Sequence, residues 1–341
     1  MRTQQLTIPA LSGGGLVLGY RCSAQCRHCL YGCGPHRSDG KPNSSEELQK
    51  VIKLLANKAP HASYHIGGGE PFLNFPILKE AIGLMRDNGL QLDYVETNSS
   101  WVKNKEETVD RLRELSQVGL RCVLVSLSPF HAEYVPLEKT LTLIAAAQET
   151  LAGGAFVWMS HFMNDLAAFP KEKVIDLDDL LQREGKAYGA SLAARYSLIP
   201  AGRAGRFIKI QGVSRPWQAL TKSSPCSARL RDTSHFHVDC EGLYVPGLCG
   251  GLVLPLEELP GEIDLDKYPI LKMLISEGVG GLVQLAKDSG FVPDDEYSSV
   301  CDLCTHTRLH LFLENEVCYP ELGPKQFYEE ASIPGFNRLV K

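Results

Sequence analysis

The chain contains 341 residues, of which 44% are hydrophobic and 22% are charged, and its formal net charge is −5. A chain of this length and composition can bury a sizeable core, and it has room for about one to three domains of ordinary size. The mild negative charge argues against a protein whose whole surface is built for nucleic acid, although a local basic patch remains compatible with it.

The chain shows no export or membrane signal. Its first fifteen residues lack a basic cluster followed by a long apolar run, and no stretch is both apolar and long enough to cross a bilayer. We therefore expect a soluble cytoplasmic protein without a membrane partner. Eleven cysteines are an odd number in a chain far too large to need disulfides, so their thiols are expected to serve metal or redox chemistry.

Strand and helix patterns alternate along the first two thirds of the chain. Ser44 with Glu47 forms a capping box, Pro76 begins a helical pattern that Gly89 ends, and Asn104 precedes a third. Repeated β-then-α units imply parallel strands with right-handed crossovers, in a sheet that is either open or curled toward a barrel. Six short runs rich in apolar, β-branched or aromatic residues are predicted as the strands, namely 13–20, 62–69, 92–98, 121–128, 155–162 and 192–200.

Unusual loops follow the first four of these strands. Three cysteines come directly after the first, and "GGGEP" (67–71), "ETNSS" (96–100) and "SLSPFH" (126–131) come at the ends of the next three. In both candidate architectures, ligands bind at the carboxyl ends of the strands, where these loops gather. We therefore expect the four loops to converge on one mouth.

The three cysteines have the spacing C-x3-C-x2-C, because they are Cys22, Cys26 and Cys29. Thiolates are good ligands for a [4Fe-4S] cluster, which needs one ligand for each iron. Three cysteines leave one iron open to a small molecule that carries an amine beside a carboxylate. The alternative is a zinc site that takes Cys33 or His28 as its fourth ligand, although tetrahedral zinc sites usually pair C-x2-C units.

The segment "CSAQCRHC", with His28 before the last cysteine, together with "GGGEP" resembles the radical S-adenosylmethionine (radical SAM) family over roughly residues 13–205. The resemblance implies an α/β fold with a partial (β/α)6 TIM-like barrel, predicted over residues 1–215. It also implies a [4Fe-4S] cluster on the three cysteines, S-adenosylmethionine (SAM) as cofactor, and an electron donor such as flavodoxin or ferredoxin. The residues that it implies at the SAM site are Gly67, Gly68, Gly69 and Glu70 for the methionine part, and Thr97, Asn98 and Ser126 for ribose or carboxylate.

Beyond residue 220 the alternation of strand and helix stops and six more cysteines occur. The segment 236–251 reads as a hairpin with Gly242 at its turn, a helical insertion follows near 268–290, and "CDLC" supplies a close pair. The arrangement is similar to the SPASM and twitch auxiliary-cluster domains, which implies a smaller C-terminal α+β iron-sulfur domain at 216–341 with one second [4Fe-4S] cluster. The matching ligands are Cys226, Cys249, Cys301 and Cys304, while Cys240 is close enough to replace one of them and Cys318 is left as a loose thiol.

The stretch 189–231 contains eight Arg and Lys residues and no Asp or Glu. It is either a solvated linker surface or the edge of a pocket for an anionic group, since arginine forks onto carboxylate or phosphate. Arg203 is the best candidate for the second interpretation, because it follows the sixth predicted strand and "PAGRA" resembles a segment of radical SAM relatives. Cys122, on an apolar strand, is interpreted as a core thiol.

Three hypotheses of function follow. The first is a radical SAM enzyme that takes hydrogen from a C–H bond of a peptide or protein. We favour it only slightly over the second, because no separate leader-binding domain is evident at the N-terminus. The second is a radical SAM enzyme that oxidises or rearranges a small metabolite such as a sugar or cofactor precursor. The third is a non-catalytic metal-binding scaffold that holds a partner.

Overall fold

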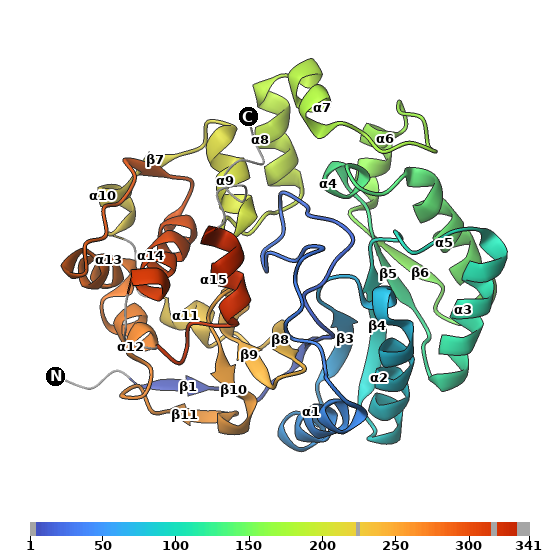
Figure 1. Ribbon diagram of the computed structural model, residues 1–341, viewed down its shortest axis with the longest axis horizontal. Coiled ribbons are helices and arrows are strands. Elements are labelled where there is room, and N and C mark those ends of the chain that lie inside the picture. The colour runs from blue at the N-terminus through green and yellow to red at the C-terminus, as the bar shows by residue number, and fades with distance from the viewer. Residues whose placement is uncertain (1–4, 223–225, 315–318, 333–341) are drawn as a thin grey trace.

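The computed structural model describes residues 5–222, 226–314 and 319–332, and its centre is one eight-stranded sheet (Figure 1). The sheet order is β10-β9-β8-β2-β3-β4-β5-β6, and the six strands from β8 to β6 run parallel while β9 and β10 are antiparallel. In the described part of the chain this sheet stays open between its edge strands. Its strands are β2 (Gly13–Val17), β3 (Ser63–Gly67), β4 (Gln91–Thr97), β5 (Val123–Ser126), β6 (Ala155–Trp158), β8 (Phe236–Asp239), β9 (Leu243–Val245) and β10 (Leu254–Pro255).

The α/β fold with a partial parallel barrel is confirmed, and five of the six predicted strands coincide with β2 to β6. The sixth prediction, 192–200, is wrong. Its first half lies in helix α8 (Lys186–Arg195), because alanines such as Ala193 and Ala194 favour a helix and the apolar residues there are too sparse to form a buried strand. The sixth parallel strand is β8, which joins the opposite edge of the sheet beside β2.

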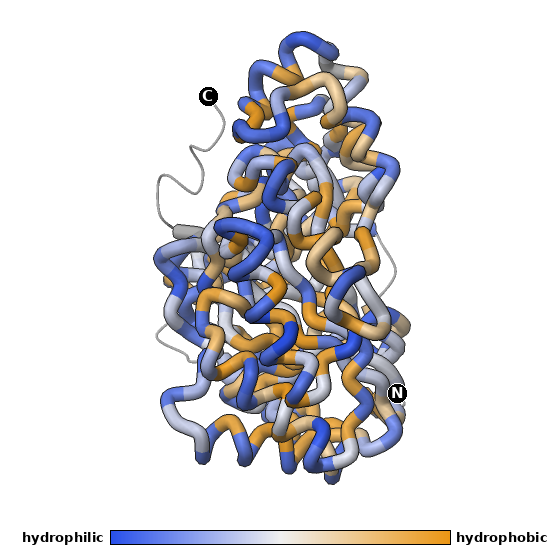
Figure 2. Tube along the Cα trace, turned by 90° about the vertical axis from the view of Figure 1, so that its right-hand side faces the viewer, coloured by the Kyte–Doolittle hydropathy of each residue, from blue (hydrophilic) through white to orange (hydrophobic). Residues whose placement is uncertain are grey.

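Helices α1 (Ser45–Lys58), α2 (Phe75–Asp87), α3 (Lys105–Val118) and α5 (Leu137–Thr150) connect successive parallel strands and cover the outer face of the sheet (Figure 1). The predicted starts are confirmed: the Ser44 side chain accepts a hydrogen bond from the Glu47 N–H, and Asn104 caps α3 in the same way through Glu107. In Figure 2, hydrophilic and hydrophobic residues alternate along the helices on this side, as expected for helices that bury one face.

The C-terminal segment returns to the sheet. The predicted hairpin is β8 and β9, with Gly242 in a left-handed conformation at its turn, and the predicted helical insertion forms α12 (Pro269–Ser276) and α13 (Gly278–Asp288). The "CDLC" pair lies on α14 (Val300–Glu314), which packs against α13 and α15 (Lys325–Ser332). The sheet therefore runs across residue 215, where the sequence predicts a domain boundary.

The remaining elements are short and complete the connections. Two of them, β1 and β11, form a separate two-stranded sheet that the sequence did not predict. They are β1 (Leu6–Ile8), η1 (Pro71–Asn74), α4 (Pro129–Ala132), η2 (Ser160–Phe162), α6 (Met163–Leu166), α7 (Leu177–Glu184), α9 (Arg203–Ile210), β7 (Arg215–Pro216), α10 (Trp217–Leu220), α11 (Ser227–Leu230), η3 (Pro246–Leu248), η4 (Leu256–Glu258), β11 (Gly261–Ile263) and β12 (Glu296–Tyr297).

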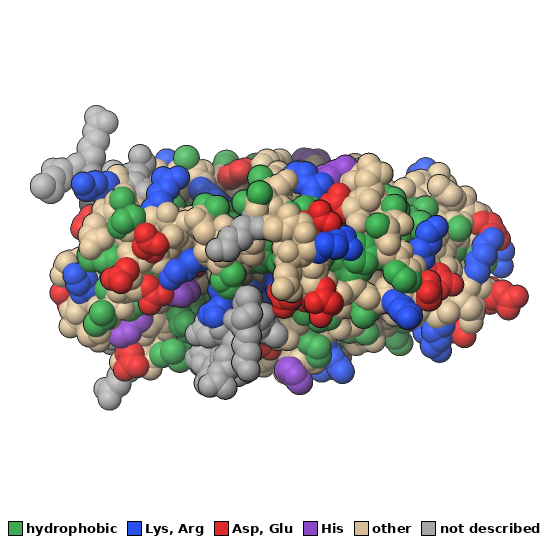
Figure 3. Space-filling view, turned by 90° about the horizontal axis from the view of Figure 1, so that it is seen from above, with side chains coloured by type: hydrophobic (Ala, Val, Ile, Leu, Met, Phe, Trp, Pro, Cys, Tyr) green, Lys and Arg blue, Asp and Glu red, His purple; other side chains and the backbone are tan. Residues whose placement is uncertain are grey.

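The long loop between β2 and α1 carries the first cysteines and lies between the sheet and the C-terminal helices (Figure 1). Among the described residues, no helix combines the length and the apolar character that a membrane span requires. On the face seen from above, Lys and Arg side chains are interspersed with Asp and Glu (Figure 3).

Candidate active site

A cavity of about 180 Å3 lies where the first four loops meet. It is lined from the cysteine loop, the glycine loop after β3, the segment after β4 and the end of β5. The predicted site residues among its lining are Cys22, Cys26, Cys29, Gly68, Gly69, Thr97, Asn98, Ser126 and Arg203. The structure thus brings nine predicted residues to one cavity, and Cys33, His28, Glu96, His131 and Tyr196 line it with them.

Two arginines hold the cysteine loop in place. The buried Arg203 donates from Nε to the carbonyl of Cys26 at 2.9 Å and from Nη2 to the carbonyl of Cys33 at 2.7 Å. Arg27 leaves the other side of the loop and forms ion pairs with Glu133 and Asp178. Arg203 therefore fixes the ligand loop from within, and it also lines the cavity. Its role at the edge of a pocket for an anionic group stays a prediction.

The sulfur atoms of this loop have hydrogen-bond donors around them. The Asn98 side-chain amide and the backbone N–H of Ala24 each donate to Cys22 Sγ at 3.4 Å, and the N–H of Cys33 donates to Cys29 Sγ at 3.3 Å. N–H donors to sulfur are one of the means by which a protein tunes an iron-sulfur cluster.

The pKa values of these thiols depend mainly on burial. Burial raises the pKa of Cys22 to about 12 and also raises that of Cys26, whereas a hydrogen bond from the Cys33 thiol lowers the pKa of Cys29. Metal ligation requires thiolates, so filling the site displaces protons from Cys22 and Cys26. The three thiols, their N–H donors and the open cavity beside them fit a cysteine-bound cluster that also receives a small-molecule ligand.

The glycines after β3 let two loops pack together. Gly68 has φ +116°, and a Cβ at Gly69 would lie 1.9 Å from the carbonyl oxygen of Arg21. The Gly69 N–H donates to the Gly19 carbonyl, and the next N–H donates to the carbonyl of Arg21, both at 2.9 Å. The loop therefore rests on the residues immediately before Cys22, an approach that a side chain would block. Gly67 is the last residue of β3.

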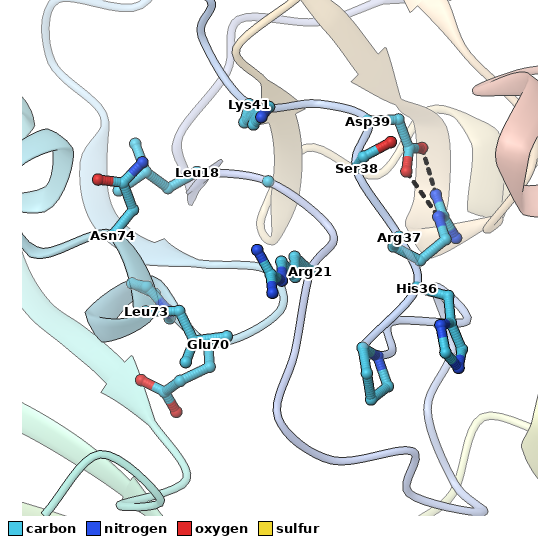
Figure 4. Close-up of a pocket in the computed structure, with 13 residues that line it drawn as sticks. Leu18, Arg21, His36, Arg37, Ser38, Asp39, Lys41, Glu70, Leu73 and Asn74 are labelled. Atoms are coloured by element: carbon cyan, nitrogen blue, oxygen red, sulfur yellow. Dashed lines mark hydrogen bonds and ion pairs between the residues drawn. The ribbon is translucent and has the colours of Figure 1, made fainter.

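Glu70 lies behind this loop and is hydrogen-bonded within the protein. Its carboxylate accepts from the Thr97 hydroxyl at 2.9 Å, from the Asn98 N–H at 2.7 Å and from the Phe72 N–H at 3.2 Å. Figure 4 shows this carboxylate turned away from the other labelled side chains of a second cavity of about 340 Å3, which Arg21 and Arg37 also line. Burial raises the pKa of Glu70 to about 7.

A third cavity, of about 300 Å3, adjoins the first and shares Gly68, Glu96, Ser126 and Tyr196 with it. Its walls are largely aromatic and apolar. The other lining residues include Tyr31, Tyr94, Leu124, Trp158, His235, His237 and Leu248. Together the two cavities connect the cysteine loop with the interior face of the sheet, which gives room for a cofactor and, beyond it, a substrate.

None of the four cysteines assigned to the second set lines these cavities, although Leu248, next to Cys249, lines the 300 Å3 cavity. Burial raises the pKa values of Cys226, Cys249 and Cys301, and the neighbouring thiols of the set, Cys304 among them, raise these three values further. Among the described residues, however, no three of these sulfurs lie within 4.8 Å of one another. A tetrahedral zinc ion would hold its sulfurs about 3.8 Å apart.

Two arginines accompany this set. Arg229 donates to Cys301 Sγ at 3.9 Å, and the buried Arg308 donates to the carbonyl of Gly250, the residue after Cys249, at 3.0 Å. Cys240 lies elsewhere, since its thiol donates to the Val17 carbonyl in the core. Cys318 lies outside the described residues.

The other basic residues of 189–231 are dispersed. Arg195 pairs with Asp165 at 2.5 Å, and Lys209 pairs with Asp294 at 3.1 Å. Cys122, predicted to be a core thiol, is half-buried and donates to the Val123 carbonyl at 3.7 Å.

Sequence reasoning missed several residues around the cavities. They are Arg27 in the cysteine loop, His131 in α4, Glu133 directly after α4 and Tyr196 directly after α8, and they shape the cysteine loop or the cavity wall. Tyr196 was assigned to a strand that does not exist. No local spacing marks such residues, because their proximity arises only when the loops fold onto one another.

Residues 16–150 match the family model of the radical SAM superfamily. Among solved structures, the chain is similar to anSMEcpe with bound AdoMet, at 12% identity over 96% of this chain and 99% of that one, with a TM-score of 0.40. It is also similar to coproporphyrinogen III oxidase (HemN) of Escherichia coli, at 13% identity over 89% of each chain and a TM-score of 0.34. SuiB of Streptococcus suis, bound to S-adenosylmethionine, matches at 12% identity over 94% of this chain and 76% of that chain, with a TM-score of 0.35. No curated protein matches the chain by sequence.

Proposed function

Because residues 16–150 form a radical SAM domain, we propose that the protein is an enzyme that cleaves SAM reductively and removes hydrogen from a C–H bond of a substrate. When bound, the [4Fe-4S] cluster and SAM would supply the difficult chemistry, namely reductive cleavage of SAM with one electron from an external donor and removal of a hydrogen atom from the substrate by the resulting 5'-deoxyadenosyl radical. The protein's task is to bind, orient and shield these groups.

The convergence of Cys22, Cys26 and Cys29 with the glycine loop on one cavity carries this proposal. The cysteines would hold three irons. Asn98 and the Cys33 N–H orient sulfur atoms, and Arg203 keeps the loop closed around the ligands.

The SAM-binding residues have unequal support. Gly68, Gly69 and Ser126 line the cavity directly, while Gly67 precedes them on β3. Glu70 acts through Thr97 and Asn98, whose positions its carboxylate fixes. We therefore assign Glu70 as a positioning residue for the methionine end of SAM, whose ammonium would donate to this carboxylate in place of one of its present donors.

For the substrate, we propose a peptide or protein side chain, with a small metabolite such as a sugar or cofactor precursor as the second candidate. The 300 Å3 cavity beside the SAM cavity supports both, because it is large enough for one side chain or one small molecule. Its aromatic wall, which includes Tyr94, Trp158 and Tyr196, favours an apolar or ring-bearing group.

We further propose that residues 216–341 hold a second [4Fe-4S] cluster on Cys226, Cys249, Cys301 and Cys304. The wide spacing of these sulfurs supports a polynuclear cluster over a single zinc ion, and Arg229 with Arg308 offsets the negative charge of four thiolates. Four cysteine ligands leave no iron open. The role of this cluster is therefore to accept the electron left on the substrate or to bind the substrate indirectly.

The proposal is tested with protein reconstituted anaerobically with iron and sulfide. With a strong reductant it should convert SAM to 5'-deoxyadenosine, measured by chromatography. The rate of this conversion should be at least about 1000-fold lower in the Cys22→Ala/Cys26→Ala/Cys29→Ala variant, because that variant cannot bind the cluster. Cys122→Ala, outside both sets, is the matched control. Cleavage that persists in the triple variant would mean that these three cysteines do not carry the reaction. No cleavage by the wild type with its iron in place would leave the metal-binding scaffold as the function.

A further inference from the structure

Three histidines meet on the inner face of the sheet, directly beside the 300 Å3 cavity. His65 on β3 and His237 on β8 flank Gly15 of β2 in register, so the three residues form a row across the parallel strands. A Cβ at Gly15 would lie 2.3 Å from His65 Nε2 and 2.8 Å from His237 Cδ2. The glycine therefore creates the space in which two imidazoles from non-adjacent strands face each other. His235, two residues before His237, points to the same face.

The ligand atoms of these side chains are close together. His65 Nε2 and His237 Nε2 are 3.1 Å apart, and one nitrogen of each histidine lies within 4.8 Å of the others. Glu96 Oε1 lies 3.7 Å from His65 Nε2. A tetrahedral zinc ion with Zn–N bonds of about 2.0–2.1 Å sets its ligand nitrogens about 3.4 Å apart. The distance between the Nε2 atoms of His65 and His237 is therefore close to the distance between two nitrogens that bind the same zinc ion.

We propose that His65, His235 and His237 bind a divalent transition-metal ion such as Zn2+, and that the Glu96 carboxylate lies beside the bound ion. Three protein ligands that leave a position for an oxygen donor are typical of catalytic zinc sites. Imidazole with carboxylate also suits Zn2+ or Fe2+ better than Mg2+ or Ca2+, which prefer oxygen ligands alone. This site is separate from both cysteine sets.

The surroundings of His237 favour ligation over simple packing. Its Nδ1 lies 2.9 Å from the Tyr31 hydroxyl, which fixes the ring and leaves Nε2 directed at His65. A metal-bound histidine commonly donates its second N–H to such an outer partner. His65 is held between the stacked rings of Tyr94 and His235.

The position of the ion suggests what it would hold. His235, His237 and Glu96 line the 300 Å3 cavity, and Glu96 also lines the SAM cavity. An open coordination position there would take a hydroxyl, carbonyl or carboxylate oxygen of the substrate. This last step rests on the proposed function, whereas metal binding by the histidines does not.

The test is the zinc content of reconstituted holoprotein after treatment with excess Zn2+ and removal of loosely bound metal by gel filtration. We expect about one zinc per chain in addition to iron. The His65→Ala/His237→Ala variant should lose that zinc and keep its iron. His61→Ala/His161→Ala, which removes two exposed histidines, and the variant lacking the four C-terminal cysteines should each retain it.

A second variant guards against misfolding of the first. His235 is exposed, so His235→Ala leaves the buried pair intact and should weaken zinc binding by about 10–100-fold. X-ray absorption at the zinc edge should show nitrogen and oxygen ligands only. Zinc that survives in both histidine variants, a sulfur shell around it, or a wild type that binds none would overturn the metal site, and none of these results would alter the outcome of the SAM-cleavage test.

Discussion

The two cysteine sets differ in how the chain delivers their ligands. Cys22, Cys26 and Cys29 come from one loop of eight residues, whereas Cys226, Cys249, Cys301 and Cys304 come from separate segments that converge only through the hairpin and α14. The first set faces a cavity with loops from three other strands around it. The second is enclosed by Arg229 and Arg308.

This difference separates two kinds of chemistry. A site one ligand short beside a cavity is suited to binding a reactant at the metal, as in catalytic metal sites that keep an open position. A site with four protein ligands and charged neighbours is suited to electron transfer or structure. The comparison is therefore open to direct tests, because removing one set should leave the properties of the other unchanged.

The largest effect is expected from the first set. If both sets hold cubanes, the reconstituted wild type should contain about eight irons per chain, and the Cys22→Ala/Cys26→Ala/Cys29→Ala variant about four, because each cubane contributes four. SAM binding, measured by equilibrium dialysis, should fall with the iron, since in the proposed site the open iron would hold the amino acid end of SAM. A triple variant that keeps eight irons would contradict the assignment of the first set.

Removing the second set should halve the iron content, as removing the first set does, but it should not abolish SAM cleavage. The Cys226→Ala/Cys249→Ala/Cys301→Ala/Cys304→Ala variant should also retain about four irons. It should still cleave SAM in the absence of substrate, because the first cavity lies elsewhere. If elemental analysis of the wild type instead shows about one zinc on these cysteines with about four irons, the second site is a closed structural one and has no electron-transfer role.

Sequence reasoning succeeded where the signal is local. The C-x3-C-x2-C spacing, the glycine loop and the caps at Ser44 and Asn104 each lie within a few residues, and helix and strand periodicity located β2 to β6. It failed at 192–200, where short-range hydrophobicity suggested a strand but the alanines favour a helix. Local patterns cannot weigh these alternatives without the tertiary contacts.

Local sequence patterns also could not predict contacts between residues that are far apart in the sequence. β8 pairs with β2 although more than 200 residues separate them, and the histidine group exists only through that pairing. The sequence predicted that Arg203 lies at the cavity, but it did not predict its hydrogen bonds to the cysteine loop, because these depend on how the loop folds. The sequence therefore predicts reactive groups better than the residues that position them.

The dependence of the first set on loop packing gives the next prediction. Gly69→Ala would place a methyl group 1.9 Å from the Arg21 carbonyl, one residue before Cys22, so the cysteine loop must move. We expect a loss of about 2–4 kcal/mol in unfolding free energy and at least about tenfold weaker SAM binding. Iron at the second set should be unaffected.

Gly83→Ala is the matched control for this change. Gly83 lies inside α2 with no heavy atom near the site of its missing Cβ, so alanine should stabilise the helix by about 0.5–1 kcal/mol. The two glycine variants should shift urea unfolding midpoints in opposite directions. Equal, small shifts would show that the loop contact with Arg21 does not constrain the cysteine loop.

The last prediction concerns Asp239 at the end of β8, which connects this strand to the cysteine loop through Tyr20. Its carboxylate accepts from the Tyr20 hydroxyl at 3.2 Å and from the N–H groups of Glu241 and Leu243 at 3.0 Å. Burial raises its pKa to about 7. An acid with a raised folded pKa binds its proton more tightly in the folded state, so its stabilising contribution is present below about pH 4 and is lost as pH rises through about 7.

Asp239→Asn removes this titration while keeping an oxygen acceptor for the two backbone N–H groups. Relative to the variant, the wild type should therefore lose on the order of 2 kcal/mol of unfolding free energy between pH 5 and pH 8, with the steepest change below pH 7. Urea unfolding of both proteins under anaerobic conditions measures the difference, in which the pH dependence of the clusters cancels. Asp288→Asn, at an exposed helix end, is the matched control for the loss of one carboxyl group. The opposite result would be a wild-type stability that rises relative to Asp239→Asn over this range. It would mean that the folded protein stabilises the charged form of Asp239, and that the contact between the cysteine loop and β8 depends on this charge rather than on the proton of the acid.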